Sequence, residues 1–170
     1  MHSLIIFDAD GTLRRCTVPG QVCPNADDQW ELLPNIKEKL SGISWGAPGS
    51  GRVAFGIASN QAGISKGYLS AETAYRLLMD MAQAAVGFRP IEGSIRFCPH
   101  GKSDGCKCRK PGSLMLEQLM EFWGVEPEQT LFVGDMESDR LAAENAGCDF
   151  KWAGDPGGFS LHGCPGGECH

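Results

Sequence analysis

Short apolar runs recur along the chain and are separated by longer stretches in which apolar and polar residues mix. Most of these runs are followed by polar residues or glycine. Such runs are typical of buried strands that lead into loops. They predict strands over residues 4–7, 53–58, 94–97 and 130–133, with a shorter strand over residues 150–152.

Several of the stretches between these runs have helical spacing. Proline favours the first turn of a helix and serine caps its N-terminus. The pattern predicts a helix after Pro34 and further helices over residues 70–86, 112–123 and 137–146. Strands that alternate with helices predict right-handed crossovers and a parallel sheet, whose ligands bind at the carboxyl ends of the strands.

Two segments fit neither pattern. Residues 13–33 contain two prolines and a glycine and are expected to form a loop or flap. The end of the chain is rich in glycine and proline, which predicts irregular structure. We therefore expect one folded domain over residues 1–153, followed by a tail over residues 154–170.

Composition and charge narrow the class of protein. The chain has 170 residues, of which 42% are hydrophobic and 21% charged, as in folded domains. It shows no apolar run near the roughly 20 residues of a membrane span and no secretory signal, so a cytoplasmic location without a membrane partner is expected. The net charge of −6 argues against broad polyanion binding but permits a small cationic pocket.

The first predicted strand runs into two aspartates that lie two residues apart. In an extended chain, Asp8 and Asp10 would share one face. Two carboxylates this close repel each other unless a cation lies between them, and Mg²⁺ prefers such hard oxygen ligands. Hydrolysis of a phosphate monoester needs a nucleophile, a proton donor and positive charge around the phosphoryl oxygens.

Other polar residues follow the later strands. Asp135 ends the fourth strand, and Asp139 lies one helical turn further on. Ser59 and Asn60 end the second strand and can donate hydrogen bonds to a phosphoryl group. Two simpler interpretations stay open: the Ser59–Asn60 pair can cap a helix, and Asp139 can complement the dipole of its own helix.

Together, four short motifs resemble those of the haloacid dehalogenase superfamily, in the same order over roughly residues 4–152. Each motif alone is weak, whereas the ordered set at predicted strand ends is specific. The resemblance implies a Rossmann-like α/β three-layer sandwich with a central parallel sheet and a magnesium-dependent phosphatase activity through an aspartyl-phosphate. The motifs are Asp8-Ala9-Asp10-Gly11-Thr12, Ser59-Asn60-Gln61, Lys110-Pro111 and Gly134-Asp135-x-x-x-Asp139.

The same resemblance implies a role for each matching residue. Asp8 would be the nucleophile, and Asp10 would be the general acid and then the base. Phosphate or substrate contacts are expected from Thr12, Ser59, Asn60, Arg109 and Lys110. Mg²⁺ would be bound by Asp8, the backbone carbonyl of Asp10 and Asp135, with Asp139 as support.

Eight cysteines in a chain without an export signal point to metal ligands rather than to disulfides. Three thiols and one imidazole lie within eleven residues, at Cys98, His100, Cys106 and Cys108. A Cys₃His set is common in closed, tetrahedral structural zinc sites, although these residues can also be unrelated members of one loop. The loop over residues 98–108 resembles the zinc loop of heptose-bisphosphate and histidinol-phosphate phosphatases, which lack a large cap domain.

The remaining cysteines are less informative. Cys16, Cys23 and Cys148 are expected to be buried or idle thiols. A second metal site in the tail is a weaker alternative to a tail without one, and its ligands would be His162, Cys164, Cys169 and His170.

The substrate is less well defined. Heptose and histidinol phosphatases usually carry arginine between the first two aspartates, whereas this chain has Ala9. The flap over residues 24–34 somewhat resembles the corresponding stretch of polynucleotide 3′-phosphatases. Arg14 and Arg15 can hold a second phosphate or a nucleic-acid backbone, or they can be solvated charges of the flap.

Three functions therefore stay open. The zinc loop and the acidic charge favour a phosphatase of a small sugar phosphate, sugar bisphosphate or histidinol phosphate. The flap alone favours a polynucleotide 3′-phosphatase. An inactive, zinc-ordered binding module is the third, and the intact aspartates and lysine of the motifs argue against it. The sequence does not indicate the oligomeric state.

Overall fold

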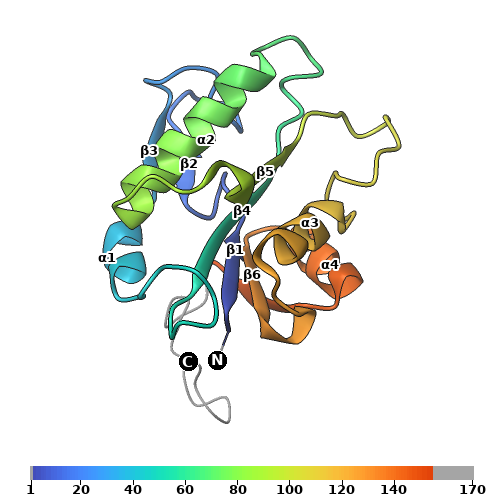
Figure 1. The fold of residues 1–170 in the computed structure, drawn as a ribbon. Coiled ribbons are helices and arrows are strands. Elements are labelled where there is room, and N and C mark those ends of the chain that lie inside the picture. Colours follow the sequence, from blue (N-terminus) through green and yellow to red (C-terminus); the bar gives the residue numbers. More distant parts are fainter. Residues whose placement is uncertain (1, 155–170) are drawn as a thin grey trace.

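A five-stranded parallel sheet forms the centre of the protein in the computed structural model, which describes residues 2–154 (Figure 1). The strand order is β5-β4-β1-β6-β7, so the first strand lies in the middle. The strands are β1 (Leu4–Phe7), β4 (Ala54–Asn60), β5 (Ile95–Cys98), β6 (Thr130–Gly134) and β7 (Asp149–Trp152). The parallel sheet and its strands agree with the sequence prediction.

The register of the sheet brings three strand ends together. Phe7 at the end of β1 lies beside Ile57 of β4 and Val133 of β6. Because the strands are parallel, the polar residues that follow them emerge at one edge of the sheet. This edge positions the candidate site.

Two pairs of helices cover the sheet, with α1 (Ile36–Ser41) and α2 (Ala71–Val86) on one face. The other face is covered by α3 (Leu114–Trp123) and α4 (Glu137–Ala146). Two 3₁₀ turns, Glu92–Ser94 and Pro127–Gln129, precede β5 and β6. These three layers confirm the predicted sandwich.

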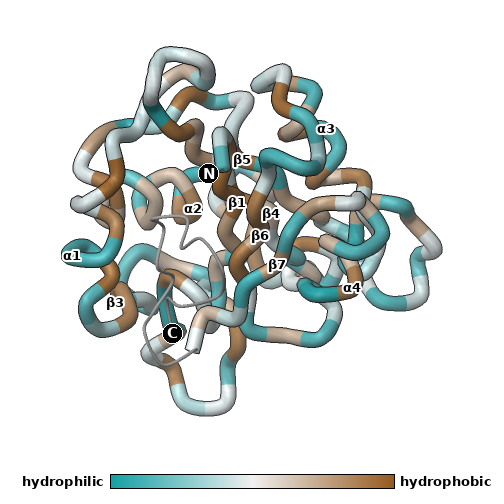
Figure 2. Tube along the Cα trace, turned by 90° about the horizontal axis from the view of Figure 1, so that it is seen from below, coloured by the Kyte–Doolittle hydropathy of each residue, from teal (hydrophilic) through white to brown (hydrophobic). Residues whose placement is uncertain are grey.

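The central strand contributes to both cores. Ile5 and Phe7 belong to the cluster beneath α1 and α2, whereas Leu4 and Ile6 belong to the cluster beneath α3 and α4. All four side chains are at most 1% exposed, so β1 is apolar throughout rather than alternating. Figure 2 shows the apolar strands gathered at the centre of the molecule.

The sequence interpretation of residues 13–33 as a loop was wrong in one respect. This segment contains an antiparallel hairpin of β2 (Arg14–Cys16) and β3 (Trp30–Leu32). Each strand has only three residues, which is too short for a period to be visible in the sequence. Trp30 and Leu32 pack against the core beneath α1 and α2, so the hairpin is anchored to the sheet.

None of the helices within residues 2–154 is long and apolar enough to cross a membrane. The proposed tail ligands His162, Cys164, Cys169 and His170 lie outside the described residues, as does most of the tail itself. The second metal site therefore stays a prediction.

Candidate active site

Three carboxylates meet at the edge of the sheet where β1 and β6 end. Asp8 follows β1, Asp135 follows β6, and Asp139 lies in the first turn of α4. One carboxylate oxygen from each of them lies within 4.8 Å of the other two. The backbone N–H of Asp8 donates to the carbonyl of Val133 over 2.9 Å, which ties the end of β1 to β6.

Two glycines make this approach of the carboxylates sterically feasible. Gly11 has a φ of +87°, and a Cβ atom there would lie 2.0 Å from Oδ2 of Asp135. A Cβ atom at Gly134 would lie 2.5 Å from Cβ of Asp139. Both contacts are far shorter than van der Waals distance, so any other residue would push the carboxylates apart.

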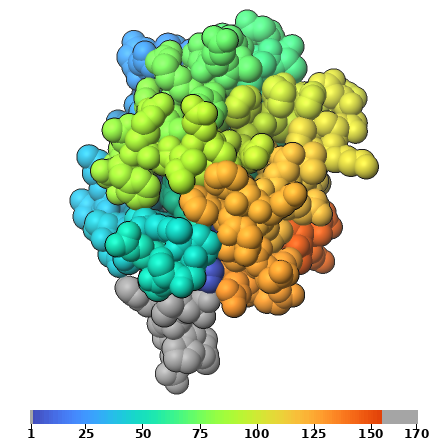
Figure 3. Space-filling view, in the orientation of Figure 1, coloured from blue at the N-terminus to red at the C-terminus, as the bar shows by residue number. Residues whose placement is uncertain are grey.

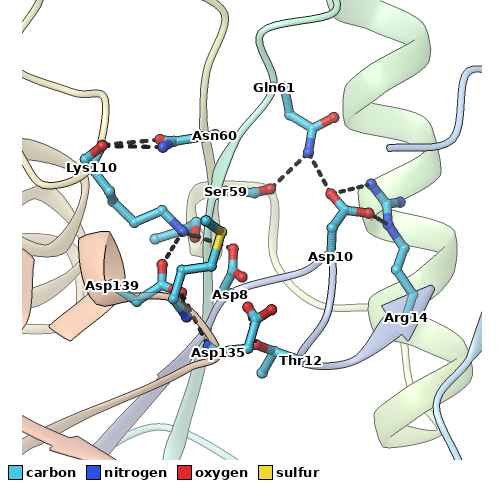
Figure 4. A network of polar contacts seen from close by, with 12 residues as sticks. Asp8, Asp10, Thr12, Arg14, Ser59, Asn60, Gln61, Lys110, Asp135 and Asp139 are labelled. Atoms are coloured by element: carbon cyan, nitrogen blue, oxygen red, sulfur yellow. Dashed lines mark hydrogen bonds and ion pairs between the residues drawn. The ribbon is translucent and has the colours of Figure 1, made fainter. Parts of the chain in front are cut away.

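A buried lysine joins two of the carboxylates. Nζ of Lys110 lies 2.7 Å from Oδ1 of Asp8 and 2.7 Å from Oδ1 of Asp139, and it donates to the carbonyl of Ala58 over 2.9 Å (Figure 4). Burial alone would lower the pKa of Lys110, but Asp8 and Asp139 outweigh it, so the pKa is raised and the ammonium group stays charged.

The electrostatics of Asp8 depend on the same neighbours. Burial raises the pKa of Asp8 well above its ordinary value; Lys110 lowers it, and the nearby Asp139 raises it further. A cation beside these oxygens would offset both the burial and the repulsion between the carboxylates.

Asp139 has two roles in the structure. Its Oδ2 accepts hydrogen bonds from the backbone N–H groups of Asp135 (3.1 Å) and Met136 (3.0 Å), which directly precede helix α4. Its Oδ1 pairs with Lys110. Asp139 therefore does stabilise the start of its own helix, as one interpretation of the sequence expected, but the same carboxylate also orients Lys110.

These residues fit a magnesium ion. Mg²⁺ needs about six oxygen ligands at roughly 2.0–2.1 Å and usually takes only one or two carboxylates from the protein. The cluster of Asp8, Asp135 and Asp139 offers one carboxylate oxygen from each residue within 4.8 Å, and the exposure of Asp135 leaves room for water and substrate to complete the shell.

Asp10 is not part of this cluster, although it lines the same cavity as Asp8. Its Oδ1 accepts a hydrogen bond from Nε of Arg14 over 2.8 Å, and its Oδ2 accepts one from Nε2 of Gln61 over 3.1 Å (Figure 4). Arg14 is 0% exposed, so the interpretation of this residue as a solvated flap charge was wrong. The exposed Arg15 next to it pairs with Glu31 on β3.

The expected phosphate contacts also make contacts within the protein. Thr12 donates to Asp135 over 3.2 Å, and Oγ of Ser59 accepts from Gln61 over 2.7 Å. The side chain of Asn60 makes two hydrogen bonds to the backbone of Lys110. Its Nδ2 donates to the Lys110 carbonyl, and its Oδ1 accepts from the Lys110 N–H. These contacts hold the motifs together, and direct phosphate binding by Thr12, Ser59 and Asn60 stays a prediction.

A cavity of about 1260 Å³ opens above the strand ends. Asp8, Asp10 and Lys110 lie in its wall. Cations from the segment after β4 and from the loop after β5 also line it, and Figure 3 shows these two segments side by side at the top of the molecule. The cations are Lys66, Lys102 and Arg109, and the exposed apolar residues of the wall are Val22, Tyr68 and Met136.

The loop after β5 brings its three cysteines and its histidine together. Cys98 lies 3.5 Å from Cys106 and 3.2 Å from Cys108 between sulfur atoms, and Nδ1 of His100 lies 3.2 Å from the sulfur of Cys108. All four ligand atoms lie within 4.8 Å of one another. The spacing in sequence therefore corresponds to one cluster in space.

This cluster fits a tetrahedral zinc ion. Zn–S bonds of about 2.3 Å place neighbouring sulfurs roughly 3.8 Å apart, so the thiols would have to spread by only a few tenths of an ångström. Desolvation raises the pKa of the Cys106 thiol, but the N–H of Arg109 and the neighbouring thiols outweigh it and lower the pKa to about 7. A thiolate is thus accessible at neutral pH, as metal binding requires.

Sequence reasoning missed three residues of this region. Gln61 was part of the second motif, but no role was assigned to it. Arg14 was assigned to the wrong environment. Cys23 was expected to be a buried or idle thiol; it is partly buried but also lines the cavity, and burial together with the nearby Asp10 raises its pKa. The only available signal was that Arg14 follows Asp10 by four residues, a spacing that has no diagnostic value outside a helix.

Comparison with known proteins places the chain in a family. Residues 107–152 match a HAD-hydrolase-like family model. The chain is 32% identical over 150 residues to a D-glycero-beta-D-manno-heptose-1,7-bisphosphate 7-phosphatase of Pseudomonas aeruginosa, covering 86% of this chain and 78% of the relative. A similar enzyme of Pasteurella multocida is 33% identical over 154 residues, with coverage of 86% and 78%.

A solved structure agrees with these relatives. The D,D-heptose 1,7-bisphosphate phosphatase of B. bronchiseptica, complexed with magnesium and phosphate, has a TM-score of 0.70 and 28% identity, covering 88% of this chain and 79% of that one. Fold, motif order and sequence similarity agree across most of the chain. The protein is therefore a phosphatase of the haloacid dehalogenase superfamily.

Proposed function

We propose that the protein is a magnesium-dependent phosphatase that removes one phosphate from a small sugar bisphosphate. The observation that carries this proposal is the cluster of Asp8, Asp135 and Asp139 beside the buried Lys110, at the end of a parallel sheet and open to a cavity. It supplies a nucleophile, a metal site and a fixed positive charge in one place.

The proposed catalytic cycle gives the two motif-one aspartates different roles. A carboxylate oxygen of Asp8 attacks phosphorus while the bond from phosphorus to the ester oxygen breaks, and the leaving oxygen takes a proton from Asp10. Asp10 then removes a proton from water, whose oxygen attacks the aspartyl-phosphate and releases phosphate and the free Asp8 carboxylate.

The metal and the lysine have different tasks in this cycle. Magnesium, held by Asp8, Asp135 and the backbone carbonyl of Asp10 with support from Asp139, would supply positive charge to the phosphoryl oxygens. Lys110 orients Asp8 through the 2.7 Å contact and provides a second charge beside the reacting phosphorus. Zinc on Cys98, His100, Cys106 and Cys108 would order the loop that carries Arg109 and Lys110.

The cavity wall favours a substrate with a second anionic group. Lys66, Lys102 and Arg109 lie along the same cavity as the catalytic residues, and the cavity of about 1260 Å³ has room for more than a phosphate. The relatives from Pseudomonas and Pasteurella carry the name of a heptose-1,7-bisphosphate phosphatase. A bisphosphorylated sugar therefore fits this wall better than a sugar with a single phosphate.

A substrate panel with Mg²⁺ tests this proposal. The panel contains a heptose bisphosphate, the matching monophosphate, histidinol phosphate and an oligonucleotide with a 3′-phosphate. We expect the highest kcat/KM for the bisphosphate and loss of its hydrolysis in Asp8→Asn. Preference for the oligonucleotide would support the polynucleotide alternative instead, and turnover that survives in Asp8→Asn would overturn the proposed nucleophile. The cytoplasmic location stays a prediction that cell fractionation can check.

A further inference from the structure

Arg14 places a positive charge in the interior of the protein. It is the first residue of β2, pairs in register with Leu32 of β3, and is 0% exposed. A buried charge costs several kcal/mol of desolvation unless a well-placed partner offsets it, and an apolar residue often serves stability as well or better. Packing alone therefore does not explain an arginine at this position.

The guanidinium group is directed at Asp10. Its Nε donates to Oδ1 over 2.8 Å, and its Nη2 lies 3.4 Å from Oδ2. The backbone holds the two residues in the same turn, because the N–H of Gly11 donates to the Arg14 carbonyl and the N–H of Arg14 donates to the Ala9 carbonyl. Arg14 can thus fix the plane of the Asp10 carboxyl group.

A second donor reaches Asp10 from another strand. Gln61 directly follows β4, is 1% exposed, and donates from Nε2 to Oδ2 of Asp10 (3.1 Å) and to Oγ of Ser59 (2.7 Å). Its own backbone N–H donates to the carbonyl of Cys98 over 2.8 Å. Asp10 is therefore held from the hairpin and from the sheet at the same time (Figure 4).

Neither donor has access to a substrate. Asp10 lines the cavity, whereas Arg14 and Gln61 do not, and both are buried. We infer that Arg14 and Gln61 are positioning residues that hold the Asp10 carboxyl group in the orientation needed for proton exchange with the leaving group and with water. This inference rests on the proposed acid–base role of Asp10.

The expected cost of losing this orientation is large. A displacement of about 1 Å in a reacting group can slow a reaction by roughly 100-fold. The effect should depend on the ester, because an alkoxide leaving group needs a proton whereas a nitrophenolate leaves without one. A merely structural residue would slow both esters alike.

The experiment measures formation of the aspartyl-phosphate by rapid quench, with Mg²⁺, for an alkyl phosphate and for a nitrophenyl phosphate. We expect Arg14→Met and Gln61→Met to slow the alkyl ester by about 100-fold, the nitrophenyl ester by only a few-fold, and to change KM by less than about twofold. Arg14→Lys, which keeps the charge but loses the fork, should restore part of the rate.

Controls separate this inference from the proposed function. The matched control is Arg15→Met on the same hairpin, which should leave both esters unchanged. If Arg14→Met does not fold, the Gln61→Met comparison decides alone. Equal slowing of both esters, a change confined to KM, or unchanged rates in a folded variant would overturn the inference. Failure of the proposed function has a different signature, namely activity that survives in Asp8→Asn or Asp10→Asn.

Discussion

The two aspartates of the first motif are only two residues apart, yet their charge partners come from different parts of the chain. Asp8 pairs with Lys110, which comes from 102 residues away and shares its charge with Asp139. Asp10 pairs with Arg14, which lies four residues away in the same turn. The charge partner of Asp8 therefore depends on the assembled sheet, whereas the charge partner of Asp10 lies in the same local turn.

This difference predicts how each aspartate responds to damage. Lys110 keeps a second carboxylate, Asp139, when Asp8 is neutralised. Within residues 2–154, Asp10 is the one carboxylate that forms an ion pair with Arg14, and Nη1 of this arginine has no hydrogen-bond partner in that range. Loss of charge at Asp10 should therefore affect the folded state more than loss of charge at Asp8.

The largest expected effect is on activity at Asp8. Asp8→Asn should lower kcat by about 10⁴-fold or more, since it removes the nucleophile, while thermal stability changes little because Asp139 still neutralises Lys110. Steady-state kinetics and calorimetry on the same preparation check both parts. An unfolding temperature well below that of the wild type would show that Asp8 contributes more to stability than its shared contact with Lys110 suggests.

Neutralising Asp10 should affect both activity and stability. Asp10→Asn leaves the Arg14 guanidinium buried without an opposite charge, which costs about 3–5 kcal/mol of unfolding free energy. It also removes a general acid–base group, typically worth about 10²–10⁴-fold in rate. Urea denaturation should show the loss, and the double variant Arg14→Met/Asp10→Asn should recover much of the stability. No recovery in the double variant would mean that the charge pair is not the cause.

Removing zinc should disturb the loop that carries Lys110, the partner of Asp8, and should leave the hairpin that carries Arg14, the partner of Asp10, nearly unchanged. The proposed zinc ligand Cys108 precedes Lys110 by two residues, whereas the Arg14 hairpin does not contribute to the cluster. Chelation or Cys106→Ser should raise KM by roughly tenfold and increase hydrogen exchange in residues 98–110, with little change at residues 14–32. Cys106→Ser protein with normal metal content, exchange and KM would argue against a zinc loop.

The pH dependence of zinc binding follows from the thiols. The pKa of Cys106, lowered to about 7, keeps this thiol ionised above neutrality, so zinc affinity should fall more steeply below about pH 7, where protons compete for Cys106 as well as for Cys98. Burial is the main cause that raises the pKa of Cys98 to about 12, so this thiol is protonated at pH 8 and releases its proton when zinc binds. Calorimetric titration in buffers of different ionisation enthalpy measures that release.

The smallest effect on stability and activity is expected for Arg15, the neighbour of Arg14 in the chain. Arg15 is 60% exposed in its side chain and pairs with Glu31 across the hairpin. An exposed pair of this kind contributes about 0–1 kcal/mol, so Arg15→Met should leave stability and kcat nearly unchanged. A loss of several kcal/mol would mean that the buried and exposed arginines do not differ as described.

The sequence predicted the parts of the site that depend on strand ends. Apolar runs located the sheet, and the carboxylates that directly follow two of these runs located Asp8 and Asp135 at one edge, because parallel strands bring their ends together. Lys110 precedes a helix instead, and its place in the site was implied by the family resemblance. The cysteine spacing likewise predicted one cluster. These features depend on short local patterns repeated at equivalent places in the fold.

What the sequence did not predict depends on contacts across the fold. Whether Arg14 is solvated or buried is decided by the three-residue strands of its hairpin, which show no period of their own. The role of Gln61 depends on β4 lying beside β1, so that one amide can reach both Asp10 and Ser59. No local sequence pattern indicates that the Gln61 amide contacts these two residues.

Gly11 has a consequence for anyone who wishes to change the specificity of this enzyme. Its missing side chain leaves just enough room for the Asp135 carboxylate, which would be 2.0 Å from a Cβ atom. A randomised library should therefore keep this codon constant and place its diversity in the cavity wall, at Val22, Tyr68 and Met136. Selection would then explore substrate shape without rebuilding the chemistry.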